Sequence, residues 1–568
     1  MWLAAFFCSA LSFSSAAMAA PRDDLLRLVP GDFGFCLVLE DLSGHGKAFA
    51  NSPFIKQFRE SPLAAKVIDA QEAQKLGLVD QFLQQYLRMT AEQLRDDILG
   101  DALVLAYRPG PPDKPGEEEG LFLLRARNPK LLADLVERLN TLQKDSGDLK
   151  DIEERGYGGK KYFARTESIS SNFYYLRGPL LAFASREETL KRMIDLDQKS
   201  AAEESALARE YRLAGVGNPL ASLWVNPRAF DRLLEKKAGE AKGGQARALQ
   251  TLLKYWQCLD AVALSIDLQE SFEIKVSVRA RANALPLAAQ RYLSAAAAPS
   301  DLWRHFPENA LFAIAGRTDV QALVDLLGDF LADEARRSIR TAVEQSAGAV
   351  FGKQAVGNTL AALGPDWGLC IVAPPSSEKA WPAQVTAALR IQRGKNARPA
   401  DLTVINGLNA LAAMAVFSHN AGKPGSLSLN SVLQDNVEVR YLENEQEFPP
   451  GFRPAFAVKG GYLVVAGSPE LVRRFRSSPS SAGRGAAANE FPLVRLSVKE
   501  LSRYLTDRRS IFVDLGAKQH HIPVEEAESK LNGLLSVLQF IDRVDITQRS
   551  DPNRAILTLQ VRTTQPLK

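Results

Sequence analysis

Two similar stretches, 282 residues apart, constrain the fold of this chain more than any other feature of its sequence. Residues 180–193 read LLAFASREETLKRM, and residues 462–475 read YLVVAGSPELVRRF. Each stretch combines an apolar run of strand length, a small polar residue and a helix-forming segment. The sequence therefore predicts a strand, a helix cap and a helix at both places.

The predicted caps use different chemistry. Ser185 and Glu188 have the spacing of a capping box, in which each side chain accepts a hydrogen bond from a free amide of the first helical turn. Ser468 precedes Pro469, and proline is favoured at the first helical position because its missing N–H would have no partner there.

Other landmarks recur in the same order along the chain. Spacings of 264 to 282 residues separate four pairs: Pro30 and Pro307, Gly100 and Gly364, Gly178 and Gly460, and Asp260 and Asp542. Each glycine of the third pair follows a basic residue and is predicted to turn the chain between two strands. An unbroken order with similar spacings indicates a tandem duplication with insertions in loops. Chance similarity among apolar strands is the alternative.

The periodicity within each copy predicts the fold class. Residues 272–281, FEIKVSVRAR, alternate strictly, as in an antiparallel strand with one face buried. A helix is predicted from Asn128-Pro129, with a one-sided leucine stripe over residues 131–139. We expect an α+β fold of two tandem homologous domains, each a mainly antiparallel sheet with helices packed on one face.

The repeat also predicts domain boundaries. We expect the first α+β repeat over residues 20–281 and the second over residues 305–568. The alanine-rich residues 282–304 between them are expected to form a linker or a connecting helix.

The N-terminus predicts export. Residues 1–19 contain no charged side chain and end in Ala17-Met18-Ala19, which matches the small-x-small pattern of a secretory cleavage site. We expect a signal peptide over residues 1–19 and a periplasmic or extracellular mature chain. A membrane anchor is the rival, but serines interrupt the run of about 18 apolar residues that an anchor needs. No later segment is expected to span a bilayer.

Charge and cysteine content exclude further classes. The net charge is +4, and no dense stripe of basic residues with interleaved aromatics suggests nucleic-acid binding. Cys36, Cys258 and Cys370 remain after the predicted cleavage, and an odd number of distant cysteines is not a disulfide framework. Cys36 and Cys370 lie in apolar runs and are expected to be buried small hydrophobes.

Histidine is scarce, and no pair has the spacing of a zinc motif. His520 and His521 could bind a metal together with Glu525 or Glu526. Adjacent residues point in different directions on regular structure, so we expect a solvated loop before a proline-capped helix instead.

Two glycine-containing segments resemble anion sites superficially. Residues 41–49, DLSGHGKAF, share Gly46-Lys47 with a phosphate-binding loop but have Asp41 at the first glycine and Ala48 in place of the hydroxyl residue. We expect a flexible turn after the first strand. Residues 155–163, RGYGGKKYF, could present amides and lysines to an anion, but a turn leading into a strand explains them equally well.

Asp260 and Asp542 are the one acidic pair that the repeat singles out, and we expect a turn or cap where a helix meets a strand. The features that the copies share are apolar strand positions, glycines, prolines and helix starts, and these residue types serve folding. The sequence therefore assigns no catalytic residue, no cofactor-binding residue, no metal ligand and no cofactor.

Three segments carry a resemblance to a known group: LVPGDFGFCLVLEDL (28–42), LGDALVLAY (99–107) and RGPLLAFASREETLKRM (177–193). Over most of the mature chain they resemble exported bacterial proteins grouped as a domain of unknown function. The resemblance implies export and an α+β fold, and it supplies no catalytic residue.

These observations favour a non-enzymatic envelope or secreted protein that binds another protein or a ligand through its paired domains. The small ligand is undefined. One alternative is a hydrolase of envelope polymers that uses carboxylates as acid and base. Another is a carrier that holds an apolar molecule between sheet and helices.

Overall fold

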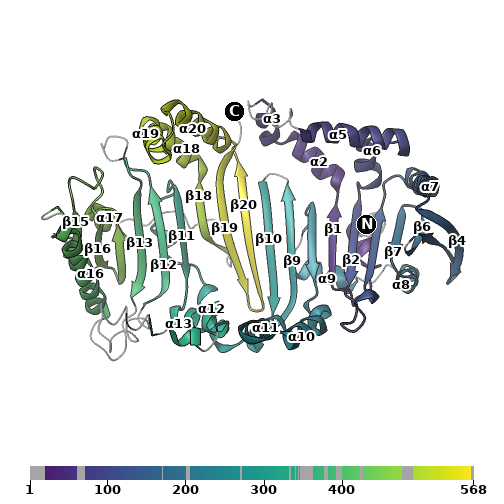
Figure 1. The fold of residues 1–568 in the computed structure, drawn as a ribbon, viewed down its shortest axis with the longest axis horizontal. Helices are drawn as coiled ribbons and strands as arrows, with labels where there is room; N and C mark the ends of the chain where they lie inside the picture. The colour runs from purple at the N-terminus through teal and green to yellow at the C-terminus, as the bar shows by residue number, and fades with distance from the viewer. Residues whose placement is uncertain are drawn as a thin grey trace, which may run out of the picture. The chain divides into compact units, whose positions relative to one another are not determined.

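The computed structural model describes residues 20–60, 71–168, 170–199, 205–215, 217–268, 271–331, 334–338, 341–342, 345, 363–375, 381–391, 400–422, 426–475 and 490–564. The predicted signal peptide at 1–19 lies outside them. The chain forms two compact units, the first comprising Met1–Ala48 and Ala70–Phe230 and the second Phe49–Asp69 and Asp231–Lys568. In both units antiparallel strands pack with helices, which confirms the α+β class (Figure 1).

The sheet of the first unit has the strand order β8-β1-β2-β3-β7-β6-β5-β4, with every neighbouring pair antiparallel. The strands are β1 (Phe35–Glu40), β2 (Ala102–Arg108), β3 (Glu119–Arg125), β4 (Leu149–Tyr157), β5 (Lys160–Glu167), β6 (Ser171–Arg177), β7 (Leu180–Ala184) and β8 (Ala221–Val225). The helices and helical turns are α1 (Pro21–Leu26), α2 (Leu42–Asn51), α5 (Gln71–Phe82), η1 (Leu83–Leu87), α6 (Ala91–Gln93), η2 (Leu94–Ile98), η3 (Pro115–Glu117), α7 (Pro129–Asp145), α8 (Glu187–Gln198), α9 (Ala206–Leu213) and η4 (Pro227–Phe230).

Helices cover both faces of this first sheet, so the expectation of helices on one face was wrong here. On one face α1 packs on β2 and β3, and α8 packs on β6 and β7. On the other face Leu132 and Leu135 of α7 pack against Leu103 and Leu124. The reason is that β2 and β3 carry apolar residues at successive positions, so both of their faces can be buried.

The sheet of the second unit has the order β9-β10-β20-β19-β18-β11-β12-β13-β17-β16-β15-β14, again antiparallel throughout. The strands are β9 (Leu259–Leu268), β10 (Ser271–Ala280), β11 (Phe312–Arg317), β12 (Leu363–Val372), β13 (Gln384–Ile391), β14 (Ser428–Gln434), β15 (Val437–Glu443), β16 (Ala455–Lys459), β17 (Tyr462–Ala466), β18 (Glu490–Ser497), β19 (Ile541–Asp551) and β20 (Arg554–Thr563). The helices and helical turns are α3 (Pro53–Glu60), α10 (Asp231–Glu240), α11 (Gly243–Trp256), η5 (Ala282–Ala284), α12 (Leu287–Ala296), η6 (Asp301–Arg304), α13 (Val320–Asp329), α16 (Ala400–Gly422), α17 (Pro469–Arg474), α18 (Val498–Asp507), α19 (Arg509–His520) and α20 (Val524–Leu538).

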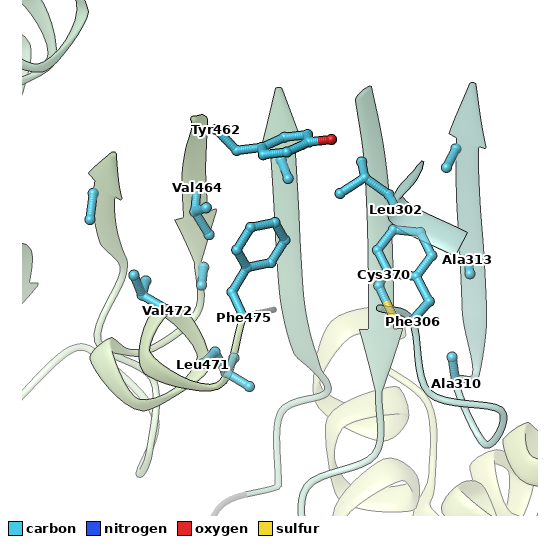
Figure 2. Packing of buried hydrophobic residues seen from close by; sticks show 14 of the residues in the cluster. Leu302, Phe306, Ala310, Ala313, Cys370, Tyr462, Val464, Leu471, Val472 and Phe475 are labelled. Atoms are coloured by element: carbon cyan, nitrogen blue, oxygen red, sulfur yellow. The ribbon is translucent and has the colours of Figure 1, made fainter. Parts of the chain in front are cut away.

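The core of the second unit lies on one face of its sheet. Small strand residues such as Ala313, Cys370 and Val464 are covered by side chains of η6, of α17 and of the residues that follow them (Figure 2). Leu302, Phe306, Leu471, Val472 and Phe475 supply most of this cover. Large side chains on the helical segments thus fill the space that small strand residues leave.

The order of strand pairing recurs along the chain. β1 pairs with β2 and β8, and β11 pairs in the same way with β12 and β18. Phe35 pairs with Tyr107, and Phe312 pairs with Ile371, so paired residues keep the spacings of 277 and 264 that separate the matched prolines and the first glycine pair. The hairpins β9-β10 and β19-β20 close each series. The repeat boundaries at 281 and 305 concern sequence similarity and stay predictions.

Local signals at turns and helix starts are partly confirmed. Gly178 and Gly460 have positive φ angles, 55° and 59°, in the turns β6-β7 and β16-β17, where glycine adopts a left-handed conformation without strain. Asn128 caps α7, because its side chain accepts a hydrogen bond from the Leu131 amide. Within residues 282–304 the chain forms η5, the helix α12 and η6 rather than an extended linker.

The two matched serines differ in role. Ser468 caps α17, with Pro469 at the first position and the Leu471 amide 3.4 Å from the serine Oγ. The capping box predicted at Ser185 was wrong, because α8 begins one residue later and has no side-chain cap. Ser185 Oγ instead accepts a hydrogen bond from the Gly120 amide at 2.9 Å, where β7 leaves its partner β3.

We expect Ser468→Ala to lower the free energy of unfolding by about 1 kcal/mol, because the first turn of α17 loses its cap. Ser468→Asn should retain most of the stability, since asparagine caps equally well. Equilibrium denaturation of both variants checks this. An unchanged stability in Ser468→Ala would show that this cap contributes nothing.

Candidate functional site

The segment after the first strand does not form a phosphate-binding loop. Residues from Leu42 onward form the helix α2, so the expected flexible turn was wrong. Asp41 has a positive φ angle of 45°, and its Oδ1 accepts a hydrogen bond from the Gly44 amide at 3.0 Å, which starts the helix. Lys47 Nζ lies 3.6 Å from Asp96 Oδ2 and therefore has an acidic partner within the protein.

The glycine-rich segment at 155–163 is a hairpin turn between β4 and β5, as predicted for the non-binding alternative. Gly158 and Gly159 both have positive φ angles, 54° and 73°, which two-residue hairpin turns require. Lys161 Nζ is paired with Glu154 Oε1 across the hairpin at 2.7 Å. Both residue types thus serve the hairpin.

The acidic and histidine candidates lie at structural junctions. Helix α19 ends at His520, His521 has a φ angle of 52°, and α20 begins at Val524. Among the described residues, no group of three or more His, Cys, Asp or Glu side chains could hold a metal ion. Asp260 and Asp542 are each the second residue of a strand that follows a helix, as expected, and Asp260 Oδ1 lies 3.3 Å from Arg281 Nε.

The three cysteines are buried and free. Burial raises the pKa of the Cys36 thiol far above its usual range and that of Cys370 to about 12. Cys258 donates to two backbone carbonyls, those of Lys254 and Ala284. The prediction that Cys36 and Cys370 are buried small hydrophobes is confirmed.

Two hollows occur in the described structure. One, of about 330 Å³, lies in the first unit between α7 and strands β4 to β6, with apolar lining from Val136, Ile152, Phe163, Tyr174 and Leu176. The other, of about 590 Å³, lies in the second unit and has a polar lining that includes Arg247 and Lys254. Within it, Tyr255 donates a hydrogen bond to Asp329 Oδ2 at 3.2 Å.

The most extensive feature is a face of the second unit's sheet that carries large apolar side chains. Residues paired across antiparallel strands point to the same face, so a chain of paired residues traces a row across the sheet. The first row crosses ten strands and contains only apolar residues: Ile266, Ile274, Leu559, Ile546, Val494, Ile314, Leu369, Ala387, Val465 and Phe456.

A second row runs beside the first across eight strands and is also entirely apolar. Its members are Leu268, Phe272, Val561, Val544, Leu496, Phe312, Ile371 and Val385. We call these two rows, together with Leu557 and its paired neighbours Val276 and Leu264, the apolar face.

The apolar face is accessible to solvent. Val465 and Leu557 are each 43% exposed, and the other members are half-buried, apart from Phe456 at the end of the first row. The helices α18 to α20 and α11 to α13 lie toward opposite ends of the strands (Figure 1). Large, contiguous and exposed apolar surfaces are uncommon on soluble proteins and indicate binding sites.

The first unit has a corresponding row on its own sheet. Seven apolar residues are paired in succession: Leu223, Leu37, Leu105, Phe122, Phe183, Tyr174 and Phe163. Leu105 is exposed, whereas Phe122 packs against the cluster under α7. Phe163 and Tyr174 also line the 330 Å³ hollow, so the row leads into it.

Sequence reasoning missed both rows. The alternation in residues 272–281 was visible, but the apolar positions were assigned to a buried face. Their exposure depends on which residues of ten strands stand opposite one another, and that pairing is not encoded locally.

One described helix, Asp401–Gly422 within α16, is long and apolar enough to cross a membrane, and 17% of its most apolar window is buried. The expectation that no later segment has these properties was therefore wrong in length and composition. The expected absence of a membrane-spanning segment from the mature chain stays a prediction.

No family model, curated protein or solved structure matches the chain. Its resemblance to exported proteins of unknown function rests on the three sequence segments that carry it.

We expect Cys36 and Cys370 to resist a thiol-specific disulfide reagent at pH 8 in the native protein, because burial blocks access and raises both pKa values. Both should react fully once denaturant unfolds the chain. Rapid reaction of either thiol in the native state would contradict its burial.

Proposed function

We propose that this chain is an exported, non-enzymatic protein that binds amphiphiles through their acyl chains, held along the apolar face. The observation that carries the proposal is the first row, which is unbroken over ten strands. At about 4.8 Å between neighbouring strands, the row is roughly 40 Å long. Each methylene group that leaves water contributes about 0.8 kcal/mol, so a chain laid along the row gains affinity with length.

The chemistry of the face favours an acyl chain over a peptide. A peptide brings N–H and C=O groups that need partners once they are buried. The two rows contain no polar side chain, and the strand backbones beneath them are already paired. An acyl chain has no such groups to satisfy.

Buried carboxylates that a hydrolase could use are occupied by structural ion pairs. Glu40 Oε2 lies 3.3 Å from Arg22 Nη1, and Asp545 Oδ1 lies 3.2 Å from Arg495 Nε. Removing a partner of a buried pair leaves an uncompensated charge, so these groups are suited to stability rather than to proton transfer. They support the non-enzymatic proposal.

The proposal includes a tandem duplication. Two observations support it: the recurring order of strand pairing and the recurring apolar row. Leu37 of the first unit and Ile314 of the second lie 277 residues apart, the spacing of Pro30 and Pro307, and both occupy the central strand of their rows. Two copies would give the protein two apolar surfaces, in a periplasmic or extracellular location set by the predicted leader.

A fluorescent fatty acid tests the function directly. We expect the wild-type protein to bind it and the double variant Val465→Glu/Leu557→Glu to bind about tenfold more weakly or worse, because two carboxylates would have to lose water beneath the acyl chain. Both residues are exposed, so the fold should tolerate the changes. Leu287→Glu/Leu293→Glu on α12 is the matched control, since it adds the same charge at exposed leucines elsewhere.

The control should bind as the wild type does, and circular dichroism should show all three proteins folded. The proposal fails if the wild type binds no probe, or if the variant on the apolar face binds as tightly as the control.

A further inference from the structure

Helix α16 presents a large apolar surface outside the apolar face. It is 23 residues long, and its outward side chains include Phe417, Leu402 and Met414, which are 79%, 57% and 50% exposed. Alanines at 410, 413, 415 and 421 fill most of the remaining outward positions. Exposing side chains of this kind to water is unfavourable, so the surface is expected to be covered in the protein's working state.

The helix carries no charge along its length. From Leu402 to Ser418 it contains no Asp, Glu, Lys or Arg, and the titratable residues Asp401 and His419 stand near its two ends, half-buried. Surface helices of soluble proteins normally carry charged residues on the side away from the core. On α16 that side consists of apolar and small side chains.

The inner side of α16 is fixed to the protein. Val404 and Ala412 are buried, and the helix packs on β14, β16 and β17. At its C-terminal end, the Asn420 side chain accepts a hydrogen bond from the Leu427 amide and donates one to the Leu427 carbonyl. A helix held along one side by strands of a folded sheet cannot be surrounded by lipid, as a spanning helix would be.

We propose that α16 docks the protein on a lipid bilayer, lying in the interface with Phe417, Met414 and Leu402 inserted among the acyl chains. Its length, its apolar outer side and its fixed inner side fit the geometry of an interfacial helix, whose apolar side enters the boundary between headgroups and acyl chains. Because the outer side has no charge, the binding needs no anionic lipid. The proposal does not depend on ligand binding by the apolar face.

A second copy of the chain is the competing occupant. Protein interfaces usually surround an apolar centre with a polar rim. The outer side of α16 lacks charged residues over its whole described length, which matches hydrocarbon better than a rimmed protein contact.

Flotation of the protein with vesicles of pure phosphatidylcholine tests this inference. We expect the wild type to float with the vesicles and Phe417→Glu/Met414→Glu to lose at least tenfold in the bound fraction. Leu287→Glu/Leu293→Glu should float as the wild type does, because α12 carries the same added charge at similarly exposed positions. Alkaline carbonate should release the bound protein, as it does for proteins that do not span the bilayer.

Three outcomes would overturn the proposal: no flotation of the wild type, equal flotation of the α16 variant, or retention after carbonate. If the wild type does not float and forms dimers that the α16 variant abolishes, the helix is a self-association surface. Failure here leaves fatty-acid binding unaffected, because Val465 and Leu557 are intact in the α16 variant.

Discussion

Antiparallel register is the constraint on which the rest of the second unit depends. A shift of one residue between two strands would turn every side chain of a strand to the opposite face, so each of the nine pairings in the first row must be correct for the row to exist. The register is irregular between Pro492 and Val494, yet Val494 still stands opposite Ile546 and Ile314. Irregularities of this kind adjust the phase of a strand.

Small residues on the opposite face make the apolar face available. Gly368 lies so close to Ala315 and Leu302 that an added Cβ would approach both within 2.9 Å. The strands therefore pack closely against η6 and α17 with glycine, alanine and cysteine, and the core does not need the larger residues of β11 and β12. Ile314 and Leu369 remain half-buried on the other side, where they can contact a ligand.

Sequence reasoning succeeded where the determining contacts are local. Gly178, Gly460, the Ser468 cap and the burial of Cys36 follow from residue type and immediate neighbours. It failed at Ser185, because the Gly120 amide that bonds the serine lies 65 residues away, and at α2, where Asp41 starts a helix that was read as a turn. The apolar face depends on pairings between strands hundreds of residues apart, such as Ile274 with Leu559.

Photo-crosslinking at neighbouring positions of β20 tests the central claim most directly. A photoreactive residue at Leu557 points to the apolar face, whereas one at Thr558 points to the opposite face of the same strand. With an alkyne-tagged fatty acid, the account predicts strong labelling from position 557 and little from position 558. Equal labelling at both positions, or none at 557, would show that the apolar face does not hold acyl chains.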